Sequence, residues 1–261
     1  MARPLSCEQT GYAVKLSTPV VSPASSKTLE LYKASVFNGT GGSITTAIAK
    51  RLASVDTKQA FFVLTSSGMP LTQTATDITS AIIAGTAGRG IFTTAANSDG
   101  FIVQCKDKFN VVAMNVTQAQ TGAPVYTYKY WNGSSFTTLT TIEVPASYAA
   151  GIQVIAFQIP TDWVTGSDPS VGGNSSGYYS ILVQATTAPS QAVQVGNGGT
   201  APSIWLARFL DSKELATKTG FEMSAFEGEP IMLDSSESLL PYFSGAANAA
   251  NTMTVLYKNS G

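Results

Sequence analysis

The chain has 261 residues, no histidine, two cysteines, 44% hydrophobic and 12% charged residues, and 15 Lys and Arg against 16 Asp and Glu. About 25% charged residues is usual for a soluble domain, so the low charged fraction of this chain implies that uncharged hydroxyl and amide groups make up much of its polar surface. A net charge of -1 offers no electrostatic footprint for nucleic acid or an anionic membrane. Without histidine the chain lacks the commonest general base and metal ligand, so the composition disfavours enzymes.

The chain carries no sequence signal for export or membrane insertion. Residues 1–10 lack an apolar run, and no stretch approaches the roughly 18 apolar residues of a membrane span. Cys7 and Cys105 lie far apart and neither belongs to a CxxC pair. We therefore expect a protein without a signal peptide, with both thiols reduced and no disulfide.

Short runs rich in Val, Ile, Phe, Tyr and Thr recur between Gly, Asn, Ser and Pro clusters, which is typical of β-strands. Two stretches, 43–53 and 212–217, allow a helical interpretation, but Thr45 and Thr46 favour extended chain and the second stretch is short. The spacing predicts an all-β fold of antiparallel, jelly-roll-like sandwiches. In chain order, the predicted strands are 28–36, 61–66, 100–105, 111–118, 125–131, 152–159, 178–185, 204–210, 229–233, 239–243 and 252–257.

Composition shifts divide the chain. Residues 1–23 hold three prolines and read as an extended N-terminal arm, and 189–202 reads as a linker rich in Gly, Pro, Gln and Asn. The segments 24–96 and 203–261 are each marginal for a sandwich but together suffice for one. We therefore predict a discontinuous sandwich of 24–96 plus 203–261 that is interrupted by a second, inserted sandwich at 97–188. Three domains in series is the alternative.

Three motifs follow one another in the middle block. They are Tyr-Trp-Asn-Gly at 130–133, Pro-Thr-Asp-Trp at 160–163 and Gly-Tyr-Tyr at 177–179. In this order and spacing the block resembles a β-sandwich module of tailed-bacteriophage virion proteins. The last strand of that module usually alternates with arginines, whereas Gln184 stands here where a basic residue is common. The Asn132–Gly133 pair itself predicts a tight type I′ hairpin, because both residues tolerate positive φ.

Aromatic residues alternate along the strand that precedes this hairpin. One strand face carries three tyrosines and the other ends in a tryptophan, and a further tryptophan closes the second motif. One interpretation is a platform on which a sugar or receptor stacks, and the alternative is that the aromatic rows fill the core. The residues of this candidate ligand or partner face are Tyr126, Tyr128, Tyr130, Trp131 and Trp163.

No pattern predicts catalysis, a metal site or a cofactor. Asp162 and Asp168 lack the spacing of a calcium loop and are expected to accept hydrogen bonds in turns. The glycine-rich stretch 85–90 lacks the P-loop lysine, so we expect a flexible loop or a contact segment. The acidic residues of the C-terminal part have no partner histidine, and are Glu222, Glu227, Glu229, Asp234 and Glu237.

The resemblance implies a non-enzymatic virion structural protein, either head decoration (cement) or part of the neck, tail or baseplate. Its partners would be other virion subunits, such as major capsid or tail proteins, and further copies of itself, assembled in the host cytoplasm. The alternative is a module at a tail or fibre tip that binds a host glycan or receptor, and a hydrolase is a distant third. In the arm, four scattered apolar residues would anchor to a neighbouring subunit: Leu5, Tyr12, Val14 and Leu16.

Overall fold

The computed structural model describes residues 6–11, 22–23, 28–67, 72–92, 98–174, 176–215, 220–224, 231–244 and 251–260. The described chain is nearly all β, with several antiparallel sheets, and the predicted all-β class is confirmed. By its contacts the chain forms two compact units. Unit 1 comprises residues 1–53 and 207–261, and unit 2 comprises residues 54–206.

These units divide the chain at other places than the composition does. Residues 59–92, predicted to belong with the flanking sandwich, pair with strands of unit 2. The stretch 189–202, predicted as a linker, contains a short strand at Val193–Val195. The Pro and Gly content that marks a linker in sequence is also the content of the turns around a short strand, so composition alone misplaces both boundaries.

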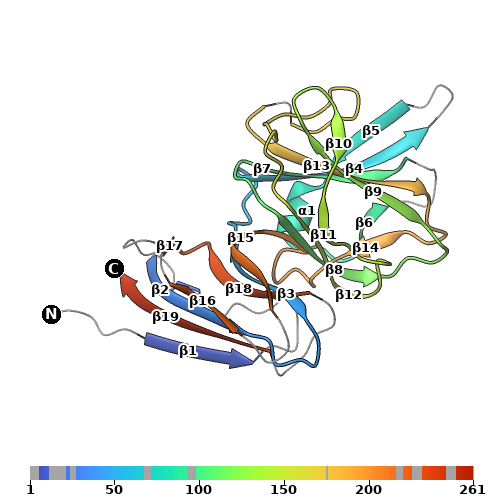
Figure 1. The fold of residues 1–261 in the computed structure, drawn as a ribbon. Helices are drawn as coiled ribbons and strands as arrows, with labels where there is room; N and C mark the ends of the chain where they lie inside the picture. The colour runs from blue at the N-terminus through green and yellow to red at the C-terminus, as the bar shows by residue number, and fades with distance from the viewer. Residues whose placement is uncertain are drawn as a thin grey trace. The chain divides into compact units, whose positions relative to one another are not determined.

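Unit 1 is a two-layer sandwich (Figure 1). One sheet has the strand order β1-β19-β2-β16, with β17 also on β2, and in the other layer β3 lies between β15 and β18. The strands are β1 (Ser6–Gly11), β2 (Thr28–Phe37), β3 (Ile44–Arg51), β15 (Ile204–Leu215, of which 207–215 belong to unit 1), β16 (Gly220–Ser224), β17 (Ile231–Leu233), β18 (Ser238–Phe243) and β19 (Thr252–Ser260).

Strand β2 shows how the sequence builds this layer. Leu29 and Leu31 are buried, and so are Ala34 and Val36, so the alternation shifts phase in between. A bulge against β19 between Leu256 and Tyr257 absorbs the shift and keeps both pairs of side chains in the core. The stretch with helical spacing, 43–53, forms strand β3, as Thr45 and Thr46 favoured.

Unit 2 is built around two sheets and one short helix (Figure 1). One sheet has the order β10-β9-β13-β7-β4-β5, and the other contains β11-β12-β8, with β14 between β8 and β6. The elements are β4 (Gln59–Ser67), β5 (Thr72–Asp77), α1 (Thr79–Ile83), β6 (Arg89–Phe92), β7 (Gly100–Cys105), β8 (Val111–Gln118), β9 (Val125–Trp131), β10 (Phe136–Thr138), β11 (Thr141–Glu143), β12 (Gly151–Phe157), β13 (Tyr179–Thr187) and β14 (Val193–Val195).

All six residues of the central strand β7 are buried, so both faces of its sheet are covered. Gly100 is required there because a Cβ atom would lie 2.2 Å from the carbonyl oxygen of Val183 on β13. The glycine-rich stretch 85–90 is held in place at its start. The Gly85 carbonyl accepts hydrogen bonds from the amides of Asn197 and Gly199, and a Cβ at Gly85 would lie 1.9 Å from the Ala201 carbonyl oxygen.

Candidate functional site

The predicted aromatic face lies on β9, which pairs with β13 on one side and β10 on the other. Tyr126 and Tyr128 are half-buried, whereas Tyr130 and Trp131 are each 8% exposed and Trp163 is 2% exposed. A pyranose ring stacks only on a ring face that solvent reaches. In this structure Tyr130, Trp131 and Trp163 are buried and present no such face.

The tyrosine row of β9 closes an aromatic cluster inside unit 2. The Tyr126 ring centroid lies 4.6 Å from that of Phe92 and 5.0 Å from that of Tyr148. Phe92 in turn contacts Phe101 edge-on at 5.2 Å. Burial raises the pKa of the Tyr128 hydroxyl and places that of Tyr148 well above its usual range. These hydroxyls therefore stay protonated near neutral pH.

The three motifs of the middle block meet at one place. The Tyr130 hydroxyl donates to Asp162 Oδ1 at 2.8 Å, and the carboxylate raises the pKa of that tyrosine. The Trp163 indole donates from Nε1 to the Ser180 carbonyl of β13 at 3.2 Å, and its ring lies edge-on to Tyr179 at 5.3 Å. We call Tyr130, Asp162, Trp163, Tyr179 and Ser180 the motif junction. It joins residues scattered through the block in one contact set.

The hairpin after β9 differs from the predicted type I′ turn. Trp131 pairs with Phe136, so the loop has four residues, and only its Gly133 has a positive φ, at 100°. The Asn132 side chain accepts hydrogen bonds from the amides of Ser134 and Ser135 at 3.0 and 2.9 Å. Asn132 therefore closes the loop through its side chain rather than through a left-handed backbone.

The other face of the β9-containing sheet is covered by the segment between β12 and β13. Gln104 of β7 donates from Nε2 to Ser180 Oγ at 2.7 Å and to the Asn174 carbonyl at 3.1 Å. The Asn174 amide returns a hydrogen bond to Gln104 Oε1 at 2.8 Å. Val171 of the same segment packs on Leu64, Ile102 and Leu182. The segment thus covers a second, smaller hydrophobic core on this face of the sheet.

Beside this segment, the outer face carries a neutral amide network. Lys129 Nζ lies 3.2 Å from Gln184 Oε1, and Gln184 donates from Nε2 to the Ser98 carbonyl at 3.1 Å. Gln73 donates to the same carbonyl at 2.9 Å. Gln184, which stands where the resembling module has a basic residue, therefore accepts from the lysine instead of adding a second positive charge.

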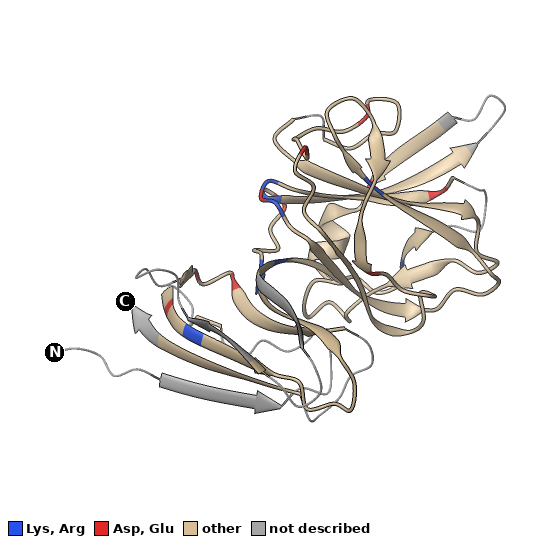
Figure 2. Cartoon of the chain, viewed as in Figure 1, with Lys and Arg blue, Asp and Glu red and all other residues tan. Residues whose placement is uncertain are grey.

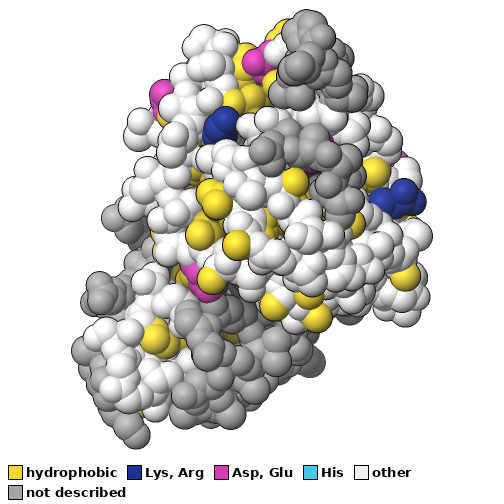
Figure 3. Space-filling model, turned by 90° about the vertical axis from the view of Figure 1, so that its right-hand side faces the viewer, with side chains coloured by type: hydrophobic (Ala, Val, Ile, Leu, Met, Phe, Trp, Pro, Cys, Tyr) yellow, Lys and Arg dark blue, Asp and Glu magenta, His cyan; other side chains and the backbone are white. Residues whose placement is uncertain are grey.

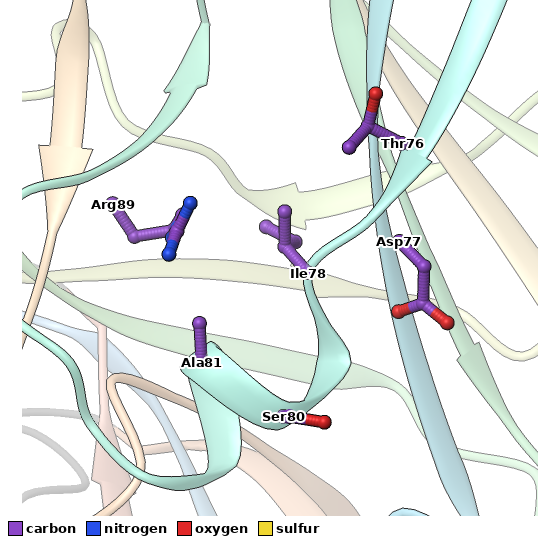
Figure 4. A pocket seen from close by; sticks show the side chains of 6 residues that line it. All are labelled: Thr76, Asp77, Ile78, Ser80, Ala81 and Arg89. Atoms are coloured by element: carbon purple, nitrogen blue, oxygen red, sulfur yellow. The ribbon is translucent and has the colours of Figure 1, made fainter.

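A small pocket of about 240 Å³ lies beside helix α1, in unit 2 (Figure 4). Arg89, Ile78 and Ala81 border its space, and the Asp77 carboxylate lies on the far side of Ile78 from the Arg89 guanidinium (Figure 4). Asp77 Oδ1 accepts the Thr79 amide at 2.8 Å in the turn that leads into the helix. The residues that line the pocket include one carboxylate, that of Asp77, whereas an acid and base pair needs two. No spacing pattern in the sequence marks it.

The remaining acidic candidates are placed as turn and surface groups. Asp168 Oδ1 accepts from the Ser170 amide at 2.9 Å, as the turn interpretation predicts. Glu237 forms an ion pair with Lys50 at 2.8 Å, and Asp234 accepts from the Ser236 amide at 2.9 Å. Within the ranges that the structure describes, no group of three or more acidic or cysteine side chains could hold a metal ion. The side chains of Glu222, Glu227 and Glu229 lie outside the described ones.

The four predicted arm anchors, Leu5, Tyr12, Val14 and Leu16, lie outside the described residues. Within the arm, residues 6–11 form β1, which pairs antiparallel with β19 of the same chain. The arm was predicted to lie on a neighbouring subunit, and within this single chain its described part completes a sheet of unit 1. A strand that contributes backbone hydrogen bonds to a sheet edge needs no apolar periodicity, so the sequence pattern did not mark it.

Charge is sparse over the described ribbon of each unit (Figure 2). In the space-filling view, hydrophobic side chains appear as separate patches among uncharged polar surface (Figure 3). Large apolar side chains that are more than a third exposed are Phe37, Val55, Val125, Ile142, Val164 and Met232. Such a surface can associate through apolar contacts and hydrogen bonds, with little electrostatic steering.

No family model, no curated protein and no solved structure matches the chain. Its function therefore has to be inferred from its sequence and its geometry. In the described part, the structure contains no helix of the length and hydropathy that a membrane crossing requires.

Proposed function

We propose that the chain is a non-enzymatic structural protein of a tailed-phage virion, in the head decoration, neck, tail or baseplate. It would act by packing against other virion subunits and against copies of itself. Its interactions would be apolar contacts, hydrogen bonds from amides and hydroxyls, and strand pairing at sheet edges.

The motif junction is the observation that supports this proposal most. The resemblance to a virion module depends on three short motifs, and short motifs can arise by chance. Here Tyr130 bonds Asp162, and Trp163 bonds Ser180 and packs on Tyr179, so each motif contacts the next. Contacts among all three favour one inherited folding module over three independent matches.

Neutral surface chemistry adds to the proposal. At the pocket beside α1, the Asp77 carboxylate accepts the Thr79 amide and so holds a turn. Elsewhere in unit 2, burial raises the pKa values of the Tyr128 and Tyr148 hydroxyls, which therefore stay protonated. An assembly protein requires nothing more of these groups.

The test is the composition of purified particles. Particles of the phage that encodes the chain are purified by density-gradient centrifugation, and their protein composition is measured by quantitative mass spectrometry. Gold-labelled antibodies against the chain then locate it on the particle by electron microscopy. The proposal predicts a fixed copy number per particle and label at one part of the virion. A chain abundant in the lysate and absent from banded particles would refute it.

Binding of a host glycan at a tail tip is the alternative function. The half-buried Tyr126 and Tyr128 are the residues of the aromatic face that could still reach a ligand at their edges. Label at the tail tip together with glycan-array binding that Tyr128→Ala abolishes would favour this alternative. Label on the head would exclude it.

A further inference from the structure

Strand β1 closes the edge of a sheet in unit 1. Its six residues, Ser6–Gly11, pair in continuous register with Thr252–Tyr257 of β19. The opposite side of β19 pairs with β2. Without β1, the backbone of β19 would present a row of unpaired amide and carbonyl groups, which is an acceptor site for another strand.

The β1 strand of another copy of the chain could make the same pairing with β19. The sequence of β1, Ser-Cys-Glu-Gln-Thr-Gly, is polar and contains no large apolar residue. Among the named elements, its substantial contacts are with β19. Pairing of this kind depends on main-chain hydrogen bonds, and these are identical whether β1 comes from the same chain or from a neighbour.

The connection between β1 and β2 is longer than pairing within one chain requires. Both strands are antiparallel to β19 and lie on its two sides, so the chain must return from the level of Thr252 to that of Ser260. That return covers about 27 Å along the strand and roughly 10 Å across it. The sixteen residues between Gly11 and Thr28 can span at most about 55 Å.

The composition of that connection suits a long reach. It contains Pro19 and Pro23, which fix φ and disfavour a compact helix. A connection that can span such a distance allows an identical element to be exchanged between protomers at small cost, because each acceptor regains the same contacts.

We propose that β1 is exchanged between copies of this chain, so that β1 of one protomer pairs with β19 of the next. Donor strand and acceptor edge are different surfaces, so the exchange links copies as a reciprocal dimer or in a ring. The proposal rests on the proposed role as an assembled subunit and names one of its partners, a second copy of the chain.

Crosslinking of two differently labelled chains tests the exchange directly. Cys7 of β1 lies opposite Leu256 of β19 in the register. One chain keeps Cys7, and the other carries Cys7→Ser with Leu256→Cys and an isotope label. The two are unfolded together, refolded, concentrated and treated with a short bismaleimide, and Cys105 is left in place because it is buried. Exchange predicts a heterodimer joined through positions 7 and 256, identified by mass spectrometry after digestion.

A matched control separates exchange from random encounter. In it the second chain carries Cys7→Ser with Thr138→Cys, at an exposed position of β10 in unit 2, and it should give at least tenfold less heterodimer. A third sample, a single chain with Cys7 and Leu256→Cys, reports closure within the chain. Efficient closure there, with heterodimer no higher than in the control, overturns the proposal.

Failure of the exchange and failure of the proposed function give different results. If β1 pairs within its own chain and the chain has a fixed copy number in banded particles, the virion role is supported and the exchange is refuted. If heterodimers form in solution but the chain never enters particles, the exchange is supported and the virion role is refuted. Deletion of residues 1–11 adds a second measurement: light scattering should show the loss of the oligomer, and an unchanged oligomer would contradict the proposal.

Discussion

Trp163 connects the segment after β12 to strand β13 with one side chain. Its ring is buried, and its indole N–H satisfies the Ser180 carbonyl at 3.2 Å. Replacement by phenylalanine keeps an aromatic ring but removes this hydrogen bond, and a typical hydrogen bond contributes about 0.5–1.5 kcal/mol to stability. We predict that Trp163→Phe lowers the free energy of unfolding by about 1 kcal/mol, measured by urea denaturation.

Tyr178→Phe is the matched control, because the Tyr178 hydroxyl makes only an exposed, long bond of 3.4 Å to the Thr57 carbonyl. Its effect should stay within about 0.5 kcal/mol. Equal effects of the two variants would show that the Trp163 hydrogen bond does not contribute as argued.

Buried and half-buried thiol and phenol groups should make the stability of the protein sensitive to alkaline pH. Burial raises the pKa of the Cys105 thiol to about 12 and raises those of Tyr126, Tyr128 and Tyr148. Because these folded-state values exceed the unfolded ones, the folded protein retains protons that the unfolded chain releases. Stability should therefore be constant near neutral pH and fall as pH rises above about 9, by up to about 1.4 kcal/mol per pH unit for each group.

Urea midpoints between pH 7 and 11 measure this slope. The double variant Tyr148→Phe, Cys105→Ala removes two of the groups and should flatten the slope, whatever its stability at pH 7. A stability that is constant up to pH 11 in the unmodified chain would contradict the assignment of these groups as buried and protonated.

At the scale of elements, the hairpin after β9 depends on one glycine. Gly133 has φ of 100°, and a Cβ there would lie 3.1 Å from Val164 Cγ2. We predict that Gly133→Ala costs about 1–2 kcal/mol from the left-handed backbone alone. Gly41→Ala is the control, since its added Cβ would have no atom within 4 Å and its φ is not in the left-handed region. Thermal unfolding of both variants measures the difference.

The sequence predicts strands where apolar residues alternate or run together, and much less well where strands are polar. Strand β7, a run of apolar residues between turns, was predicted at 100–105 and is found there. Strands β1 and β5 are polar and were missed, because no alternation of large apolar residues marks them in the sequence. Helix α1 was missed for a related reason: its five residues are too few to show a period.

The candidate site shows the same limit. Alternation along β9 predicts Tyr126, Tyr128 and Tyr130 on one strand face, and the structure packs Tyr126 of that row against Phe92 and Tyr148. The burial of that ring depends on β6 and on Tyr148, which belong to other segments of the chain. The motif junction and the pocket beside α1 likewise join distant residues, which no single spacing pattern encodes.

At the scale of the whole molecule, unit 1 is formed from the two ends of the chain and unit 2 from the stretch between them. The chain leaves unit 1 after β3 and returns to it in β15, and these two strands pair with each other. Arg51 at the end of β3 pairs with Ala207 of β15, so the two cut ends of unit 1 lie at neighbouring positions of paired strands. A chain in which a turn replaces unit 2 should therefore retain every strand of unit 1.

Excision of unit 2 tests most directly the claim that each unit has its own core. Residues 1–53 are joined to 207–261 through a short Gly-Ser linker, residues 54–206 are expressed alone, and cooperative unfolding of each is followed by circular dichroism and nuclear magnetic resonance. The account predicts dispersed spectra and a single cooperative transition for both proteins. A spliced chain or an isolated 54–206 that is soluble yet unfolded would contradict it.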